Sequence, residues 1–287
     1  MNVLTFDIED WFHVLDNPST KTEKQWVQLE CRIHQNLDRI LDILKKHNQK
    51  ATFFCIGWVA RRYPTIVKKI DNYGHEIGSH SDMHQLAYEF NREEFRQDLE
   101  QSIKSIEDVV GKKVRAYRAP GFSLKHQNSW MLEELSKHGI EIDCSVFPAR
   151  RAHGGFKEFG HAEPAYVEID GARIKEFPIN LYSLFGKNII FSGGGYFRLI
   201  PYPLIKFFMK TSDYVMVYLH PRDFDYDQPM IEGLSAFRRF KSYVGLKTTS
   251  NKLDRLLNDF DFVDLREANK NIDWSQVKTI KLNRKDK

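Results

Sequence analysis

Hydrophobic positions recur along this chain in two periods, one typical of strands and one typical of helices. A short apolar strand is predicted over residues 3–9 and a helix over residues 31–47, where five aliphatic side chains recur at helical spacing. Strands over residues 51–56 and 75–78 and a helix over residues 92–110 continue the alternation. The remaining predicted elements are strands over residues 114–117, 140–143, 214–219 and 262–263 and helices over residues 128–138, 203–210 and 250–258. Strand and helix in alternation are typical of parallel βα units, and we favour their closure into a barrel.

The alternation breaks between about residues 150 and 200, where glycines are frequent. A hairpin is predicted within this stretch, joining residues 165–170 to residues 173–177. Because the alternation resumes afterwards, we interpret the stretch as an insertion in a single domain of residues 1–270. Residues 271–287 then form a basic C-terminal tail, which we expect to be solvated and frayed.

The composition narrows the classes of function. The chain has 43 basic and 39 acidic residues and a formal net charge of +4, which gives little electrostatic reason to expect a nucleic-acid partner. Its three cysteines, Cys31, Cys55 and Cys144, lack CxxC spacing. This spacing argues against a disulfide framework or a thiolate zinc site, and it fits a reducing compartment.

The start of the sequence and its apolar runs are used to predict the cellular location of the protein. No cleavable export signal precedes the first predicted strand, and no run approaches the ~18 consecutive apolar residues that span a bilayer. We therefore expect a cytoplasmic protein without a transmembrane segment. A lipid-linked substrate would still bring such a protein to the membrane as a peripheral partner.

Two histidines four residues apart, His80 and His84, follow a predicted strand and are suited to bind one metal ion from the same side. The same spacing also occurs on ordinary surface helices, so a third ligand is needed from another strand end. Asp7, Glu9 and Asp10 supply three acids at the end of the first predicted strand. The structural alternative is that these acids cap the start of a helix.

A site with three protein ligands leaves one coordination position open, and a water molecule held there has its pKa lowered toward ~7. Hydroxide is then available near neutral pH for attack on a carbonyl group. Asp7, the last residue of the strand proper, is placed to take the proton of that water, and Glu9 or Asp10 remains as the third ligand. The pattern indicates a metal-dependent hydrolase.

Two further strand ends carry candidate groups. His220 ends the strand predicted over residues 214–219 and can serve as a general acid for a leaving amine or alkoxide. Taken alone, His220 is better explained as a structural histidine, but the acids and imidazoles expected on the same barrel rim favour the catalytic role. Arg118 begins a turn over residues 118–123, where a guanidinium could orient a carboxylate base, and a plain surface turn is the alternative.

Together these residues resemble the polysaccharide deacetylases of carbohydrate esterase family four, the NodB type, whose motifs occur in order between about residues 2 and 265. The matching segments are residues 5–10 (TFDIED), 80–84 (HSDMH), 118–120 (RAP), 143–148 (DCSVFP) and 218–220 (YLH). The last segment has tyrosine where the family motif begins with leucine. Five motifs in the family's order are far more specific than any one of them.

The resemblance implies a distorted (β/α)7-type barrel with the predicted hairpin as an elaboration. It implies Asp7 as the base, held by Arg118, and His220 as the acid, with His80 and His84 as metal ligands. It also implies that a backbone N–H at Gly121, beside Phe122, helps to stabilise the oxyanion. Many relatives carry a tyrosine at the Gly121 position, but only the backbone is required there.

The first motif departs from the family pattern, because adjacent aspartates in many members are replaced here by Asp7-Ile8-Glu9-Asp10. Glu9 is favoured as the third ligand, since on an extended chain it shares a face with Asp7, and Asp10 is its rival. The accessory candidates for substrate binding are Asp143 and Ser145, which we expect to support the groove wall, and Trp11, which could stack on a sugar ring or pack against the barrel rim.

The function implied is removal of acetyl from N-acetylated sugars of a glycan or glycan precursor, in the biosynthesis of a surface polysaccharide. We expect a divalent metal cofactor, with Zn²⁺ first and Co²⁺ or Ni²⁺ as alternatives. The expected partner is an acetylated sugar or oligosaccharide, free or lipid-linked. Two rival functions remain open: hydrolysis of a cyclic amide or imide by the same fold, as in allantoinase-like enzymes, and glycan binding by a catalytically silent site.

Overall fold

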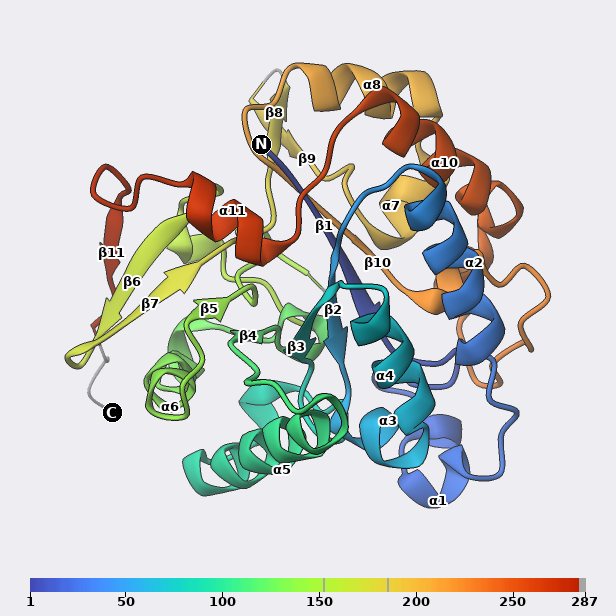
Figure 1. Ribbon diagram of the computed structural model, residues 1–287, viewed down its shortest axis with the longest axis horizontal. Coiled ribbons are helices and arrows are strands. Elements are labelled where there is room, and N and C mark those ends of the chain that lie inside the picture. Colours follow the sequence, from blue (N-terminus) through green and yellow to red (C-terminus); the bar gives the residue numbers. More distant parts are fainter. Residues whose placement is uncertain (152, 185, 284–287) are drawn as a thin grey trace.

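A nine-stranded sheet forms the centre of the computed structural model, which describes residues 1–151, 153–184 and 186–283 (Figure 1). Its strands are β1 (Asn2–Ile8), β2 (Thr52–Cys55), β3 (Glu76–Ser79), β4 (Ala116–Tyr117), β5 (Ile142–Asp143), β6 (Ala165–Ile169), β7 (Ala172–Glu176), β10 (Val215–Leu219) and β11 (Thr279–Lys281). They lie in the order β10-β1-β2-β3-β4-β5-β7-β6-β11. Every neighbouring pair is parallel except β6 and β7, so the carboxyl ends of the first seven strands in this order meet at one edge.

Helices follow the parallel strands and cover the outer side of the sheet, with α2, α3, α4 and α5 beside β1, β2 and β3 in Figure 1. The helices are α1 (Glu23–Trp26), α2 (Ile33–Lys46), α3 (Gly57–Arg62), α4 (Pro64–Asn72), α5 (Arg92–Val110), α6 (Met131–Lys137), α7 (Gly194–Leu199), α8 (Tyr202–Lys210), α9 (Ala236–Tyr243), α10 (Thr249–Asp259) and α11 (Leu265–Asn271). The five aliphatic side chains that predicted α2 are all buried in the main core.

The helix predicted over residues 92–110 is α5, and local chemistry explains its ends. Asn91 accepts a hydrogen bond from the Glu94 N–H, and the Glu94 carboxylate accepts one from the Asn91 N–H, which forms a capping box. Gly111 ends the helix at φ +66°, a conformation that glycine adopts without a steric cost. One face of the helix buries Phe95, Leu99 and Ile106.

The predicted distorted barrel is confirmed, although the hydrogen-bonded strands form no closed ring among the described residues. Beyond β10, the segment after the β6–β7 hairpin curls around the open side. The Tyr218 N–H donates to the Ser192 carbonyl at 3.1 Å, and the Met216 N–H donates to Asn180 Oδ1 at 3.1 Å. An apolar core fills the inside of the curved sheet, with Phe54, Ala116, Phe122, Ile142, Phe147, Phe177, Met216 and Tyr218 among its members.

The insertion between residues 150 and 200 contains the predicted hairpin. Strands β6 and β7 meet in a two-residue turn in which Asp170 and Gly171 have φ values of +47° and +83°, the left-handed pair that suits a tight hairpin. Strand β7 joins the main sheet beside β5. A second, separate hairpin of β8 (Tyr182–Leu184) and β9 (Lys187–Ile189) was not predicted from the sequence.

Two predictions near the C-terminus are wrong. Residues 279–281, expected in a frayed tail, form β11, which pairs in parallel with β6 at the edge of the main sheet. Residues 284–287 of the predicted tail lie outside the described residues. Residues 262–263, predicted as a strand, provide only an isolated bridge from Val263 to Val3, because the chain turns into α11 directly afterwards.

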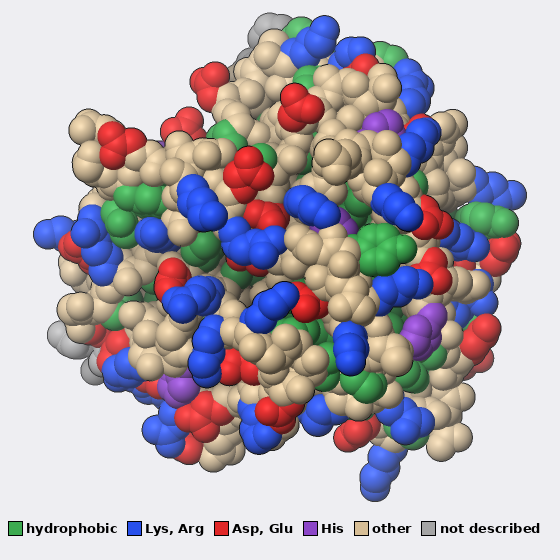
Figure 2. Space-filling view, viewed as in Figure 1, with side chains coloured by type: hydrophobic (Ala, Val, Ile, Leu, Met, Phe, Trp, Pro, Cys, Tyr) green, Lys and Arg blue, Asp and Glu red, His purple; other side chains and the backbone are tan. Residues whose placement is uncertain are grey.

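The surface carries both signs of charge. On the face in Figure 2, lysine and arginine side chains are interspersed with aspartate and glutamate side chains, which agrees with the near balance of 43 basic and 39 acidic residues. In the part of the chain that the structure describes, no helix combines the length and the apolar character needed to cross a membrane.

Candidate active site

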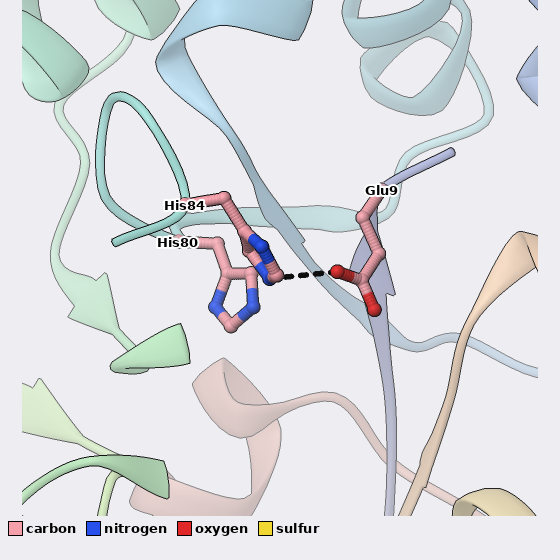
Figure 3. A group of neighbouring side chains, drawn as sticks. All are labelled: Glu9, His80 and His84. Atoms are coloured by element: carbon pink, nitrogen blue, oxygen red, sulfur yellow. Dashed lines mark ion pairs between the residues drawn. The ribbon is translucent and has the colours of Figure 1, made fainter. Parts of the chain in front are cut away.

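Glu9, His80 and His84 come together at the carboxyl edge of the sheet, just after β1 and β3 (Figure 3). One potential ligand atom from each side chain lies within 4.8 Å of the others. The closest pair is His84 Nε2 and Glu9 Oε2, 2.7 Å apart, and all three residues are buried. Two imidazoles and a carboxylate form a donor set that suits zinc or a similar divalent ion.

His80 is held in one tautomer. Its Nδ1 lies 2.7 Å from the Arg118 carbonyl oxygen, and because a carbonyl can only accept, Nδ1 carries the proton. The lone pair of Nε2 is thereby left for a metal ion, which is the usual outer-shell arrangement of a histidine ligand. Burial lowers the pKa of His80 to about 4, although Asp7 opposes the shift, so the ring is neutral at physiological pH.

The loop from His80 to His84 is strained and firmly held. Ser81 and His84 both have positive φ values, +65° and +54°, which are uncommon for residues other than glycine. Ser81 Oγ accepts a hydrogen bond from the His84 N–H, and the Asp98 carboxylate of α5 accepts from the Asp82 and Met83 N–H groups. These contacts fix the two imidazoles on one side of the loop. Strain held in this way is typical of functional sites.

Of the two predicted carboxylate ligands, Glu9 lies in this cluster and Asp10 lies outside it. The Asp10 carboxylate accepts hydrogen bonds from the Trp11, Arg32 and Ile33 N–H groups at 2.8, 2.8 and 3.3 Å. It therefore holds the start of α2, the capping role considered as the structural alternative. Burial raises the pKa of Asp10 to about 6.

Asp7 and Arg118 form a buried ion pair, as the sequence predicted. Arg118 Nη1 lies 2.7 Å from Asp7 Oδ1 and also donates to Thr5 Oγ1 at 2.9 Å. The guanidinium is completely buried and stacks on the Phe54 ring, 4.3 Å from its centroid. The second oxygen of Asp7 faces the site, 3.7 Å from His220 Nε2.

His220 follows β10 and points its two ring nitrogens in different directions. Its Nε2 lies 3.4 Å from Glu9 Oε1, and its Nδ1 lies 2.9 Å from Asp223 Oδ2. Burial lowers the pKa of His220, but Asp223, Glu9 and Asp7 outweigh it and raise that pKa to about 9. The ring is therefore charged at neutral pH, in contrast to His80.

The sequence did not identify Asp223 or Arg198 as site residues. Arg198 of α7 pairs with Asp223 at 2.9 Å. Burial opposes ionisation of Asp223, but Arg198 and His220 hold its pKa at about 2. The available signal was the spacing of His220 and Asp223, since an acid three residues into a turn can accept from the first residue's N–H, as Asp223 does at 2.9 Å.

The remaining predicted residues lie around the Arg118 loop. Gly121 has a φ of +62°, which suits glycine, and a Cβ there would lie 2.7 Å from Leu15 Cδ1, so a larger residue would require the Leu15 side chain to move. Phe122 is buried at φ +54°, with its ring 4.9 Å from that of Tyr218. Gly121 and Phe122 thus border the site through the backbone, with no polar side chain.

Asp143 and Ser145 are buried beneath this loop, as a supporting role requires. Ser145 Oγ donates to Asp143 Oδ1 at 2.6 Å and accepts from the Ala119 N–H at 2.8 Å. Asp143 also hydrogen-bonds Glu176 of β7, and burial raises the pKa of both carboxyl groups. One proton shared between them allows two buried acids to lie side by side.

Of the two roles predicted for Trp11, stacking on a sugar or packing against the barrel rim, the structure supports packing. The side chain is 6% exposed, belongs to the main core, and donates its indole N–H to the Glu30 carbonyl at 2.9 Å. Its ring packs edge-on against Phe12, 5.7 Å away. Packing at the barrel rim, the stated alternative, accounts for this residue.

Comparison with known proteins gives two family matches on consecutive parts of the chain. Residues 3–142 match the polysaccharide deacetylase family, and residues 144–270 match a domain of unknown function (DUF3473). A peptidoglycan-N-acetylglucosamine deacetylase of Bacillus cereus is 38% identical over 128 residues, which are 44% of this chain and 46% of that protein. A chitooligosaccharide deacetylase of Azorhizobium caulinodans is 35% identical over 111 residues, 38% of this chain and 51% of that protein. The matched part is about half the length of these relatives.

Solved structures show the same fold at low identity. A polysaccharide deacetylase structure from Mycobacterium smegmatis aligns with a TM-score of 0.66 at 18% identity and covers 100% of this chain and 94% of that one. The peptidoglycan deacetylase PdaC from Bacillus subtilis aligns with a TM-score of 0.51 at 15% identity, over 94% of this chain and 90% of that one. The first half of the chain is therefore similar to the polysaccharide deacetylase family, and the chain as a whole shares the fold of these solved structures.

Proposed function

We propose that this chain is a hydrolase that removes the acetyl group from N-acetylated sugars of a glycan or glycan precursor. The observation that carries the proposal is that a candidate base and a candidate acid lie side by side, each held by a partner of opposite charge. Asp7, a carboxylate held by an arginine, and His220, an imidazole held by a carboxylate, lie 3.7 Å apart beside the three candidate metal ligands. Amide hydrolysis requires a base that takes a proton from the attacking water and an acid that protonates the departing nitrogen.

Asp7 acts as the general base in this proposal. Arg118 binds Oδ1 and fixes the position of the carboxylate, which leaves Oδ2 to accept a proton from the attacking water. Because Arg118 is completely buried, its charge is little screened by solvent. The water then attacks the acetyl carbonyl, and the Gly121 N–H is placed by the resemblance to bind the oxyanion.

His220 acts as the general acid. Asp223 accepts from Nδ1, so the exchangeable proton for the substrate is the one on Nε2, which faces Asp7 and Glu9. Transfer of that proton to the amide nitrogen lets the amine leave as the C–N bond breaks. The products are acetate and a free amino sugar.

Glu9, His80 and His84 fit a divalent cation and would hold it in this site. Glu9 Oε2 is buried and has no hydrogen-bond donor among the described residues, although it lies next to His84 Nε2, so a cation there would satisfy an otherwise unpaired oxygen. When bound, the cation would supply Lewis-acid polarisation of the acetyl carbonyl. Zinc is the proposed metal, with cobalt or nickel as substitutes.

The named relatives support an N-acetylglucosamine-containing glycan as the substrate class. Peptidoglycan and chitooligosaccharide deacetylases are among the relatives that the chain matches. We further propose that residues 1–270 act as one domain in the biosynthesis of a surface polysaccharide. In support, the region that matches DUF3473 supplies both His220 and Asp223 to the site, and its strand β10 pairs with β1.

Acetate release tests the proposal directly. Purified protein loaded with zinc or cobalt should release acetate from N-acetylglucosamine oligomers and leave a cyclic ureide such as allantoin unchanged. Ring opening of allantoin without acetate release would favour the cyclic amide alternative. Tight glycan binding without turnover of any acetylated sugar, in protein with a full complement of metal, would favour a silent binding protein.

A further inference from the structure

Arg151, in the insertion, sits in a clamp of three aromatic rings. Its guanidinium carbon lies 4.3 Å from the ring centroid of Phe147, 5.2 Å from that of Phe122 and 5.9 Å from that of Tyr218. Nη1 donates a hydrogen bond to Tyr218 Oη at 2.9 Å. The side chain is half-buried. Stacking of this kind fixes the plane of a guanidinium and leaves the N–H groups along its edge directed outward.

The clamp lies beside the active site. Tyr218 is two residues before His220, and their rings are 6.1 Å apart. On the other side, Phe122 follows Gly121, and the Gly155 N–H donates to the Phe122 carbonyl at 3.0 Å, which ties the segment after Arg151 to this loop. Arg151 is thus placed between the loop proposed to bind the oxyanion and the strand that carries the acid.

Within the described part of the chain, Arg151 forms no ion pair with an acid. Asp16, which lies on this rim, is paired with His153, whose Nδ1 lies 2.7 Å from Asp16 Oδ2. Arg238 of α9 donates to the Leu15 and Asp16 carbonyls on the same rim. A guanidinium has five N–H donors, and only one of those of Arg151 is used by Tyr218.

We propose that Arg151 binds an anionic substituent, a carboxylate or a phosphate, carried by the substrate next to the acetamido group. An oriented guanidinium beside the site matches the two oxygens of such a group, and the surrounding rings lower the local dielectric. The preferred substrates are then acidic glycans or sugar phosphates, and neutral oligomers of N-acetylglucosamine bind more weakly. This inference rests on the proposed function for the identity of the substrate, but the binding preference does not require turnover.

Binding of matched sugars, measured in the presence of a chelator, tests the binding preference separately from the proposed deacetylase function. Titration calorimetry would compare hyaluronan tetrasaccharide with chitotetraose for the carboxylate, and N-acetylglucosamine 1-phosphate with N-acetylglucosamine for the phosphate. We expect wild-type protein to bind at least one anionic sugar about tenfold or more tightly than its neutral counterpart, as charge-assisted hydrogen bonds allow. Arg151→Gln should remove this preference without weakening binding of the neutral sugar. The arm that shows the preference identifies the anion.

Arg150, exposed and one residue away, offers a control with the same charge. Arg150→Gln should keep the preference for the anionic sugar. If Arg151→Gln misfolds, Arg151→Lys replaces it in the test; this variant keeps the positive charge and should retain part of the preference. Equal binding of anionic and neutral sugars by wild type, a preference that survives Arg151→Gln, or equal loss in Arg150→Gln would overturn the proposal. If acetate release fails for every sugar while the preference follows Arg151, the deacetylase proposal falls and this one stands.

Discussion

The Nδ1 atom of His220 lies 2.9 Å from Asp223 Oδ2, and the same carboxylate also accepts the backbone N–H of His220. The pair fixes both the rotation of the imidazole and the position of its proton. Arg198, which contacts the other oxygen of Asp223, keeps the carboxylate charged within a buried environment. His220, the proposed acid, is thus oriented by Asp223, and Asp223 is held in turn by Arg198.

Replacement of Asp223 by asparagine should therefore impair proton donation. Because Asp223 raises the pKa of His220, its loss lowers that pKa, and the protonated acid disappears at a lower pH. We expect kcat/KM for acetate release to fall by roughly 10²- to 10⁴-fold and its alkaline limb to move down by about one to three pH units. A pH profile of wild type and variant, both loaded with the same metal, measures both effects. Asp227→Asn, at an exposed position of the same loop, should change neither.

The assignment of the carboxylate ligand to Glu9 separates two adjacent acids. Glu9→Gln and His84→Ala should each weaken cobalt binding by more than the about 10- to 100-fold that outer-shell changes cost. Asp10→Asn should bind cobalt normally but unfold at a lower temperature, because it weakens the cap of α2. Cobalt titration by absorbance and thermal unfolding give the two readouts. Loss of cobalt binding in Asp10→Asn alone would reverse the assignment.

Arg118 has a structural as well as a chemical role. Arg118→Met removes the partner of a buried carboxylate and leaves Asp7 uncompensated, so the free energy of unfolding should fall by about 3–5 kcal/mol. Urea unfolding monitored by circular dichroism measures this change. Arg115→Met, at an exposed position near the other end of β4, should shift stability by less than about 1 kcal/mol. Similar values for the two variants would contradict the description of Arg118 as a buried partner.

Glu76 of β3 predicts a dependence of stability on pH away from the site. Burial raises its pKa from 4.5 to about 7, although hydrogen bonds from Thr52 and the Arg266 N–H oppose the shift. Between about pH 4.5 and 7 the folded chain therefore binds more protons at this group than the unfolded chain, and its contribution to stability is lost as the pH rises. Glu76→Gln should lack this loss.

Urea unfolding at several pH values tests the expectation. Relative to wild type, Glu76→Gln should gain roughly 2 kcal/mol in its free energy of unfolding between pH 4.5 and 7.5. Glu89→Gln, at an exposed position, should follow wild type across the range. A difference between wild type and Glu76→Gln that stays constant with pH would show that Glu76 titrates normally.

The sequence predicted the parts of the fold and site that depend on local patterns. Helix α5 shows helical periodicity and a capping box, and β1 and β3 end in the acids and imidazoles that meet because parallel strands share a carboxyl edge. The contribution of Arg198 could not be predicted in this way. It comes from a glycine-rich stretch without periodicity, and its partner Asp223 lies 25 residues further along the chain.

The elements that the sequence missed depend on tertiary contacts. Strand β11 has three residues and a basic composition, and it exists because β6 offers an edge for pairing. Helix α9 fully buries none of its residues: Phe237 and Phe240 are 68% and 54% exposed, and Tyr243 at its end packs partly buried against the main core. The sequence left two roles open for Trp11, because its burial depends on tertiary packing that no local pattern shows.

Acetate release by zinc-loaded wild type and Asp7→Asn, compared on N-acetylglucosamine oligomers at equal metal content, tests the proposed mechanism most directly. Wild type should release acetate, and Asp7→Asn should bind zinc equally well yet lose at least about 100-fold in kcat/KM, because the base is gone while Glu9, His80 and His84 remain. Unchanged acetate release in Asp7→Asn, or none from wild type with a full complement of zinc, would contradict it.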